Sequence, residues 1–226
     1  MKIIESAAYR PCREDAIKFW PKVQVEPLID GSRALPVLNA AYNGIRRMVI
    51  GRKHQNNDME YQLDNWMYGV ESFYCENGAM DYATAFSFAL QHRFDTVVDI
   101  GCADGVQSEL IAGTQVRYIG VEPSAGLFWR PFNFSYIRKK YPCEIPVYGK
   151  FLGISRLCTG YLMTDYLAIA KDFDDFLLDG PIEAALKLSR YYREVSVLHD
   201  SRNPHTNGWL WFHGSIQRNR KETEHA

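Results

Sequence analysis

The stretch TVVDIGCADG, residues 96–105, restricts the possible folds of this chain more than any other segment. A run of branched residues leads into Asp99, and the turn that follows has small residues at its tight positions, Gly101, Ala103 and Gly105. A buried strand that ends in such a turn and leads into a helix is typical of α/β proteins that bind a ligand at the turn. We therefore expect this stretch to begin an α/β core.

Short branched runs alternate with helical segments along the rest of the chain. The predicted strands are TVVDI, VRYIGVE, EIPVY, DFLLD and VSVLH, and the predicted helices between them lie at residues 108–112, 126–140, 154–170 and 181–194. Apolar strands that alternate with helices predict a doubly wound, mostly parallel sheet with helices on both faces. Helical spacing also predicts two helices ahead of the sheet, at residues 59–70 and 79–92.

Prolines and glycines interrupt residues 1–57, which predicts an irregular segment there. We therefore divide the chain into an N-terminal helical and irregular appendage, residues 1–78, and an α/β domain, residues 79–226. A chain of 226 residues that is 46% hydrophobic can bury one substantial core, which fits a single main domain.

Composition excludes several classes of protein. With 26 basic and 27 acidic residues, the bulk charge does not favour nucleic acid or an anionic membrane. The five cysteines are scattered and never in C-x-x-C spacing, which argues against a disulfide framework or a zinc site. No stretch approaches the roughly 20 apolar residues of a membrane span, and the first residues lack the apolar centre of a signal peptide. We expect a soluble, cytoplasmic protein.

Ligands of parallel sheets bind outside the carboxyl ends of the strands, so the residues that end each predicted strand are candidate site residues. They are Asp99 to Gly105, Glu122, Gly149, Lys150, Asp179, Gly180, His199 and Asp200. The carboxylate of Glu122 can accept both hydroxyl hydrogens of a ribose, which indicates a cofactor that contains a nucleoside.

The turn distinguishes between such cofactors. A dinucleotide fingerprint that starts at Gly101 fails at its third glycine, because Val106 stands there. The carboxylate of Asp104 would also repel a pyrophosphate. S-adenosylmethionine has no phosphate, and it carries a sulfonium and an ammonium that Asp99 would attract.

The segments VVDIGCADG and YIGVEPS resemble the first two motifs of the Rossmann-like S-adenosylmethionine-dependent methyltransferases, and FDDFLLDGP resembles their fourth-strand motif. The resemblance covers about residues 80–200 and implies that S-adenosylmethionine lies on the turn with its ribose on Glu122. The cofactor-binding residues predicted in this way are Asp99, Gly101, Cys102, Ala103, Asp104, Gly105, Glu122, Pro123, Lys150 and Phe151.

Two features depart from the family pattern. Lys150 stands where the third strand of the family usually ends in an acid or a polar group near the adenine. Only 26 residues follow Asp200, fewer than the usual helix and closing antiparallel hairpin need, which predicts a shortened C-terminal sheet edge.

The strand ends LDGP and LHDS look like those of small-molecule and sugar O-methyltransferases. The resemblance implies Asp179 and Asp200 as Mg²⁺ ligands and catalytic residues, with His199 or His205 as the base. The predicted acceptor is a small molecule or a saccharide. Asp179 could instead cap the helix that begins at Pro181.

Two other functions stay open at this point. One is a non-catalytic protein that keeps the methyltransferase fold for binding. The other is methylation of RNA or protein, with docking on a basic cluster made of Arg46, Arg47, Arg52, Lys53 and His54. Salt-dependent association with RNA would favour the second of these.

Overall fold

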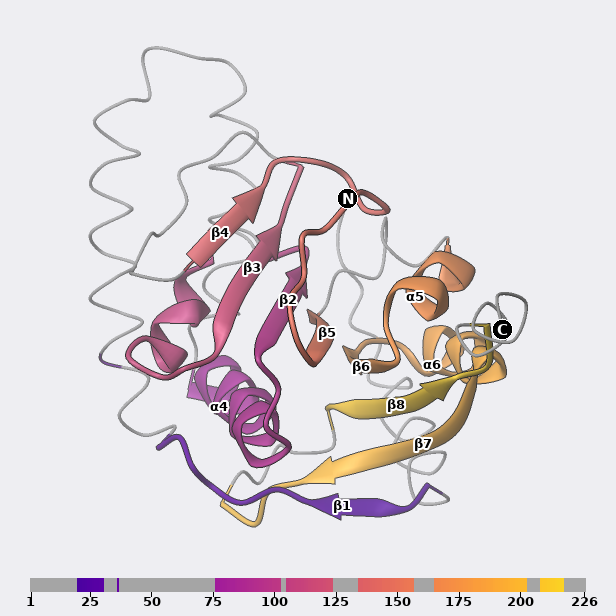
Figure 1. Cartoon of the computed structure of the whole chain (residues 1–226). Helices are drawn as coiled ribbons and strands as arrows, with labels where there is room; N and C mark the ends of the chain where they lie inside the picture. The colour runs from indigo at the N-terminus through magenta and orange to yellow at the C-terminus, as the bar shows by residue number, and fades with distance from the viewer. Residues whose placement is uncertain are drawn as a thin grey trace, which may run out of the picture.

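A computed structural model describes residues 20–30, 36, 76–102, 105–123, 134–156, 165–202 and 208–217. These residues form one eight-stranded sheet with helices on both sides (Figure 1). The strands are β1 (Lys22–Gln24), β2 (Thr96–Ile100), β3 (Arg117–Val121), β4 (Phe134–Ile137), β5 (Phe151–Arg156), β6 (Asp175–Asp179), β7 (Tyr192–His199) and β8 (Leu210–Ser215). The α-helices are α4 (Glu76–Gln91), α5 (Tyr166–Asp172) and α6 (Ile182–Leu188), and the 3-10 helices are η1 (Val106–Ile111) and η2 (Ser189–Tyr191).

The strand order is β1-β7-β8-β6-β5-β2-β3-β4, and every pairing is parallel except those of β8 with β6 and β7. The expected α/β class and mostly parallel sheet are therefore confirmed. From β2 the chain winds outward through β3 and β4, and then returns to pair β5 with the other side of β2. The carboxyl ends of β2 and β5 thus meet at the topological switch point, where doubly wound sheets bind their ligands.

Side-chain alternation along the strands builds two cores. All five side chains of β2 are buried, as a central strand covered on both faces requires. Val97 packs with α4 on one side, and Val98 packs with α5 and α6 on the other. The helix expected at residues 79–92 is confirmed as α4.

The middle of the chain departs from the prediction. Strand β4 lies within residues 126–140, which were expected to be helical, and β5 covers the start of the predicted helix 154–170. Residues 144–148 form no strand. Pro146 cannot donate a ladder hydrogen bond, which disfavours a central strand there. The apolar residues of β5 occupy the central position in the sheet, between β6 and β2, where the strand at residues 144–148 was expected.

The C-terminal edge of the sheet is not shortened, contrary to expectation. Strand β8 runs antiparallel between β6 and β7, and β1 adds a further strand beyond β7. Antiparallel neighbours need only a short connection, so the few residues after Asp200 suffice to return the chain into the sheet.

Residues 20–30 were assigned to the irregular appendage, yet they supply β1 and a fully buried core residue, Val25. The other expectations for residues 1–75, which include the helix at 59–70, lie outside the described residues. None of the helices in the described ranges has the length and apolar character that crossing a bilayer requires.

Candidate functional site

The carboxyl ends of the strands carry buried charged side chains on the α4 side of the sheet. Asp99, Glu122, Arg156, Asp179 and Asp200 each lie at or just after the end of a strand, in phase with residues that pack against α4. Their exposed fractions lie between 0% and 6%. Charged side chains are almost never buried to this degree unless they are paired or bind something. These five residues define the candidate site.

Asp99, in β2, is the most enclosed member of the site. Its Oδ2 accepts hydrogen bonds from the hydroxyl of Tyr118 at 2.6 Å and from Nε2 of Gln107 at 2.7 Å. Its Oδ1 has no hydrogen-bond partner among the residues that the structure describes. One oxygen of this carboxylate is therefore fixed by the protein, and the other is unsatisfied in a place that water does not reach.

Burial raises the pKa of the Asp99 carboxyl to about 6. The hydrogen bonds from Tyr118 and Gln107 lower it, the charge of Glu122 raises it, and that of Arg156 lowers it. At neutral pH, Asp99 is mostly ionised but held against a substantial burial penalty. A cation close to Oδ1 would relieve that penalty.

The turn after β2 requires glycine. Gly101 and Gly105 have φ values of 76° and 73°, in the left-handed region that side chains disfavour. A Cβ added to Gly105 would lie 2.2 Å from the hydroxyl oxygen of Tyr136. In β3, a Cβ on Gly120 would lie 2.6 Å from Sγ of Cys102. The backbone of β2, the turn and β3 is therefore closely packed.

Glu122 lies next to this turn, as the sequence predicted. The backbone N–H of Gly101 donates to the carbonyl of Val121 at 2.7 Å, which places Glu122 beside the turn. Pro123 follows it and is exposed. Cys102 is buried, and Ala103 and Asp104 lie outside the described residues.

Arg156, the last residue of β5, lies between two acids. Its Nη2 donates to Oδ2 of Asp81 in α4 at 2.8 Å, and its Nε lies 3.4 Å from Oδ2 of Asp179. Burial alone lowers the pKa of Arg156, but Asp179 and Asp81 raise it, so the net pKa lies above the ordinary value. The guanidinium stays charged and joins α4 to the ends of β5 and β6.

The alternative role of Asp179 as a helix cap is not observed. Pro181 occupies the N-cap position of α6, with no side-chain cap hydrogen bond. Asp179 is instead ion-paired with Arg156.

Asp179 and Asp200 do not end neighbouring strands, contrary to expectation, because β8 lies between β6 and β7. Oδ2 of Asp200 accepts from the hydroxyl of Thr84 at 3.2 Å, and its Oδ1 accepts from the backbone N–H of Arg202 at 3.0 Å. Among the described residues, no group of three or more His, Cys, Asp or Glu side chains could hold a metal. The arrangement of these two acids does not fit the predicted Mg²⁺ site.

Three predicted residues lie away from the acids. His199 is in phase with Val197, which packs on the α5 and α6 side, so alternation places His199 on the opposite side of the sheet from Asp200. Lys150 and Phe151 were expected at the carboxyl end of a strand, but they stand at the amino end of β5. The reason is that the strand predicted at residues 144–148 does not form, and β5 begins at Phe151 instead. His205 and the basic cluster lie outside the described residues.

Sequence reasoning missed Gln107, Tyr118, Arg156 and Asp81. The charged end of FLGISR was a usable signal for Arg156, but the helix predicted at residues 154–170 covered it. Gln107 lies outside the quoted motifs and Tyr118 begins YIGVEPS, but only the fold brings their side chains to Asp99.

A comparison of the chain with protein-family models found no match, and neither did a comparison with curated proteins. The fold and the site therefore define only a structural class of protein. It is an α/β protein with a doubly wound, mostly parallel sheet and a buried acidic site at its switch point.

Proposed function

We propose that this chain is an S-adenosylmethionine-dependent methyltransferase whose cofactor binds at the carboxyl ends of β2 and β3. The observation that carries the proposal is the fully buried carboxylate of Asp99, with an unsatisfied Oδ1. A buried carboxylate in this state destabilises the fold, and a cationic ligand would offset that effect. S-adenosylmethionine has two cationic groups and supplies an electrophilic methyl group when bound.

Other features of the site support this cofactor. The carboxylate of Glu122, just after β3, is suited to the hydroxyl groups of a ribose. The parallel part of the sheet has the same strand order as dinucleotide-binding domains, so NAD is the main competitor. Val106 and the concentration of acids disfavour it, because carboxylates repel a pyrophosphate.

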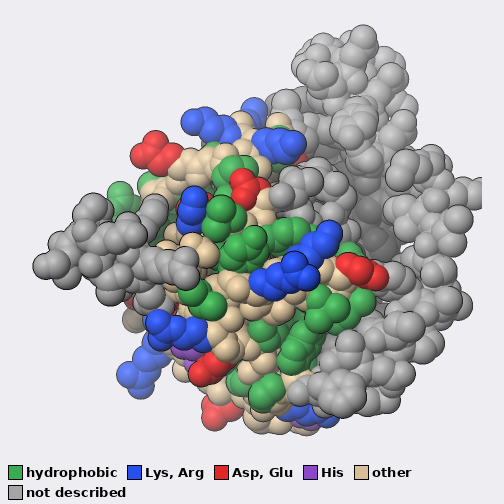
Figure 2. Space-filling model, turned by 90° about the vertical axis from the view of Figure 1, so that its right-hand side faces the viewer, with side chains coloured by type: hydrophobic (Ala, Val, Ile, Leu, Met, Phe, Trp, Pro, Cys, Tyr) green, Lys and Arg blue, Asp and Glu red, His purple; other side chains and the backbone are tan. Residues whose placement is uncertain are grey.

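For the acceptor, we propose a hydroxyl of a small molecule or a saccharide. The acids near the switch point outnumber the single arginine there, which disfavours a polyanionic substrate. Figure 2 shows the side of the molecule on which α5 and α6 lie in Figure 1. In its coloured part, Lys and Arg side chains stand among acidic and hydrophobic ones and form no continuous basic stripe.

Calorimetric titration with S-adenosylmethionine, S-adenosylhomocysteine and NAD tests the cofactor. Asp99→Asn and Glu122→Ala should each weaken S-adenosylmethionine binding by about 1.5 to 3 kcal/mol, the scale of a hydrogen bond to a charged group. Glu183→Gln, a matched loss of charge on the exposed surface of α6, should leave it unchanged. Parental affinity in both site variants, or tight binding of NAD, would show that the cofactor is placed wrongly.

Binding without methyl transfer is the second candidate. It is favoured by the ion pairs around Arg156, because Asp179 and Asp81 are engaged there instead of being poised as bases. A panel of hydroxylated small molecules and saccharides, with S-adenosylhomocysteine formation as the readout, separates the two functions. Bound but unconsumed S-adenosylmethionine across the panel would favour the binding protein.

A further inference from the structure

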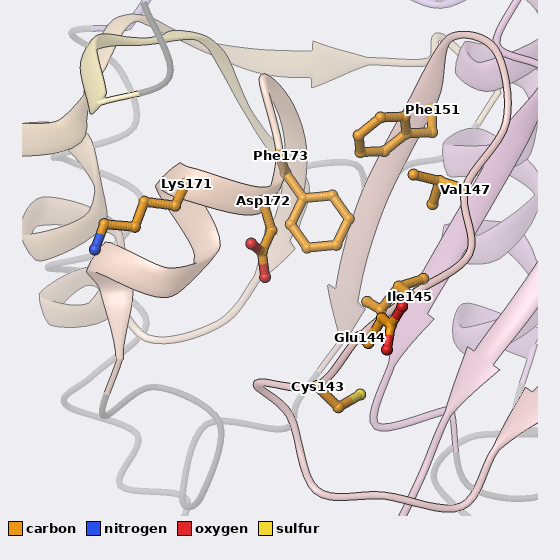
Figure 3. A pocket seen from close by; sticks show the side chains of 8 residues that line it. All are labelled: Cys143, Glu144, Ile145, Val147, Phe151, Lys171, Asp172 and Phe173. Atoms are coloured by element: carbon orange, nitrogen blue, oxygen red, sulfur yellow. The ribbon is translucent and has the colours of Figure 1, made fainter. Parts of the chain in front are cut away.

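A cavity of about 260 Å³ lies on the side of the sheet opposite the buried acids (Figure 3). Ile145, Val147, Phe151 and Phe173 form its apolar walls. Phe151 begins β5, and Phe173 follows α5. The cavity thus lies between the segment that precedes β5 and the end of α5, remote from the cofactor site proposed above.

The segment 143–147 shapes one wall. Cys143, Ile145 and Val147 are partly buried against the core, whereas Glu144 between them is exposed. The segment alternates like a strand although it pairs with none in the described sheet. Just before it, the hydroxyl of Tyr141 donates to Oδ2 of Asp172 at 2.8 Å and ties the segment to the end of α5.

The charges at the rim are unequal. Asp172 and Glu144 both line the cavity and are exposed at its edge. Lys171 also belongs to the lining, but Figure 3 shows its ammonium directed away from the other side chains. A ligand in this cavity would therefore meet aromatic and aliphatic walls and the carboxylates of Asp172 and Glu144, with the positive charge of Lys139 acting near Cys143.

The size of the cavity limits the ligand. Drug-sized ligands occupy pockets of roughly 300–1,000 Å³, so this cavity suits a smaller molecule. A single water occupies about 30 Å³, so several waters would be needed to fill the space. An apolar body is a better match for Phe151 and Phe173.

We propose that this cavity is a binding site for a small primary amine whose body is one aromatic ring or a branched aliphatic chain. The apolar body lies against Phe151 and Phe173, and the ammonium is directed to the carboxylates of Asp172 and Glu144. The site is independent of the proposed methyltransferase function, because it lies on the other side of the sheet.

Binding in the cavity can be measured through the reactivity of Cys143, because its free thiol lines the cavity. The experiment follows the alkylation rate of Cys143 in the full chain by an uncharged maleimide, with mass spectrometry of the Cys143 peptide. Phenethylamine, a probe of about nine non-hydrogen atoms, should protect Cys143 saturably with a Kd on the order of 1 mM. 3-Phenylpropionate, of similar size and opposite charge, should not protect it.

Variants test whether the carboxylates of Asp172 and Glu144 contribute to binding of the amine. Asp172→Asn combined with Glu144→Gln should weaken protection by phenethylamine about three- to ten-fold, because the lost ion pairs are solvent-exposed. Glu183→Gln, a matched change on α6, should leave protection as in the parent. Equal protection by the amine and the carboxylate, absence of saturation, or undiminished protection in the double variant would each overturn the proposal.

Discussion

Asp99 gives the folded protein a dependence on pH that can be measured without any ligand. Its pKa of about 6 lies above the ordinary value of 3.8, which applies when the chain is unfolded. Between about pH 4 and pH 6 the unfolded chain therefore loses this proton while the folded chain keeps it, and stability falls as pH rises. Above about pH 6 the full loss, about 2 to 3 kcal/mol, is present.

Asp99→Asn should remove this contribution. We expect urea unfolding at pH 4 and pH 7 to show a smaller decrease in stability for the variant than for the parent, and a variant that is at least as stable as the parent at pH 7. An equal decrease in both proteins would contradict the buried, unsatisfied state of Asp99. If Asp99→Asn is more stable than the parent and binds the cofactor more weakly, the Asp99 carboxylate contributes to ligand binding at the expense of stability.

Gly120 tests the packing behind the turn. In Gly120→Ala the new Cβ would lie 2.6 Å from Sγ of Cys102 and 2.7 Å from the Tyr136 ring, so neighbouring groups must shift. We expect a loss of about 1 to 3 kcal/mol in denaturant unfolding, typical of an overpacked core. Gly113→Ala serves as a control, since a Cβ there meets nothing within 4 Å and only the positive φ opposes it, which costs about 1 kcal/mol. A larger loss in the control than in Gly120→Ala would contradict this packing.

Arg156 connects secondary-structure elements, and its removal should affect how they assemble. Arg156→Met leaves the buried carboxylates of Asp81 and Asp179 without their shared cation, which should destabilise the protein by about 3 to 5 kcal/mol. Arg202→Met is the comparison, because its side chain is 39% exposed, pairs with Asp200 at 3.7 Å and donates to the carbonyl of Ile29 at 3.2 Å, so its loss should cost less than the loss of Arg156. Thermal or denaturant unfolding measures both. Similar losses in the two variants would refute a structural role for the buried cluster.

The sequence predicts those elements whose local pattern and final environment agree. TVVDI, DFLLD and the helix that became α4 were recognisable because their apolar patterns match their burial. FSYI was hidden within a longer segment with helical character, and its role as β4 depends on pairing with β3. Strand β8 could not be predicted for a different reason. It pairs antiparallel with β6 and β7, and the local sequence pattern of a strand does not specify which strands it pairs with.

The candidate site was predictable to the same extent. Asp99, Gly101, Gly105 and Glu122 were found because they belong to two recognisable motifs, VVDIGCADG and YIGVEPS. The environment of Asp179 was not predicted, because its partner Arg156 lies in a part of β5 that was expected to be helical. The face on which His199 lies follows from side-chain alternation with Val197 in β7.

The molecule as a whole includes residues 20–30 in its main core. Val25 is fully buried among residues that pack under α4, so Val25→Ala should destabilise the entire domain by about 2 kcal/mol and keep a single unfolding transition. Leu28→Ala is the control, because Leu28 is 52% exposed and its truncation should change stability by less than about 0.5 kcal/mol. Calorimetry that resolves a separate early transition in Val25→Ala would show that β1 belongs to an independent unit.

The pairing of β1 with β7 also sets an order of events during synthesis. Strand β1 leaves the ribosome long before its partner β7, and β7 joins β6 only through β8, which follows it in the chain. Such contacts between distant parts of a chain form slowly. The half of the sheet around β2 can assemble while the chain is still growing, whereas β1 must wait with its edge and Val25 exposed. A nascent chain of this protein therefore depends, until β8 emerges, on protection from association with other chains.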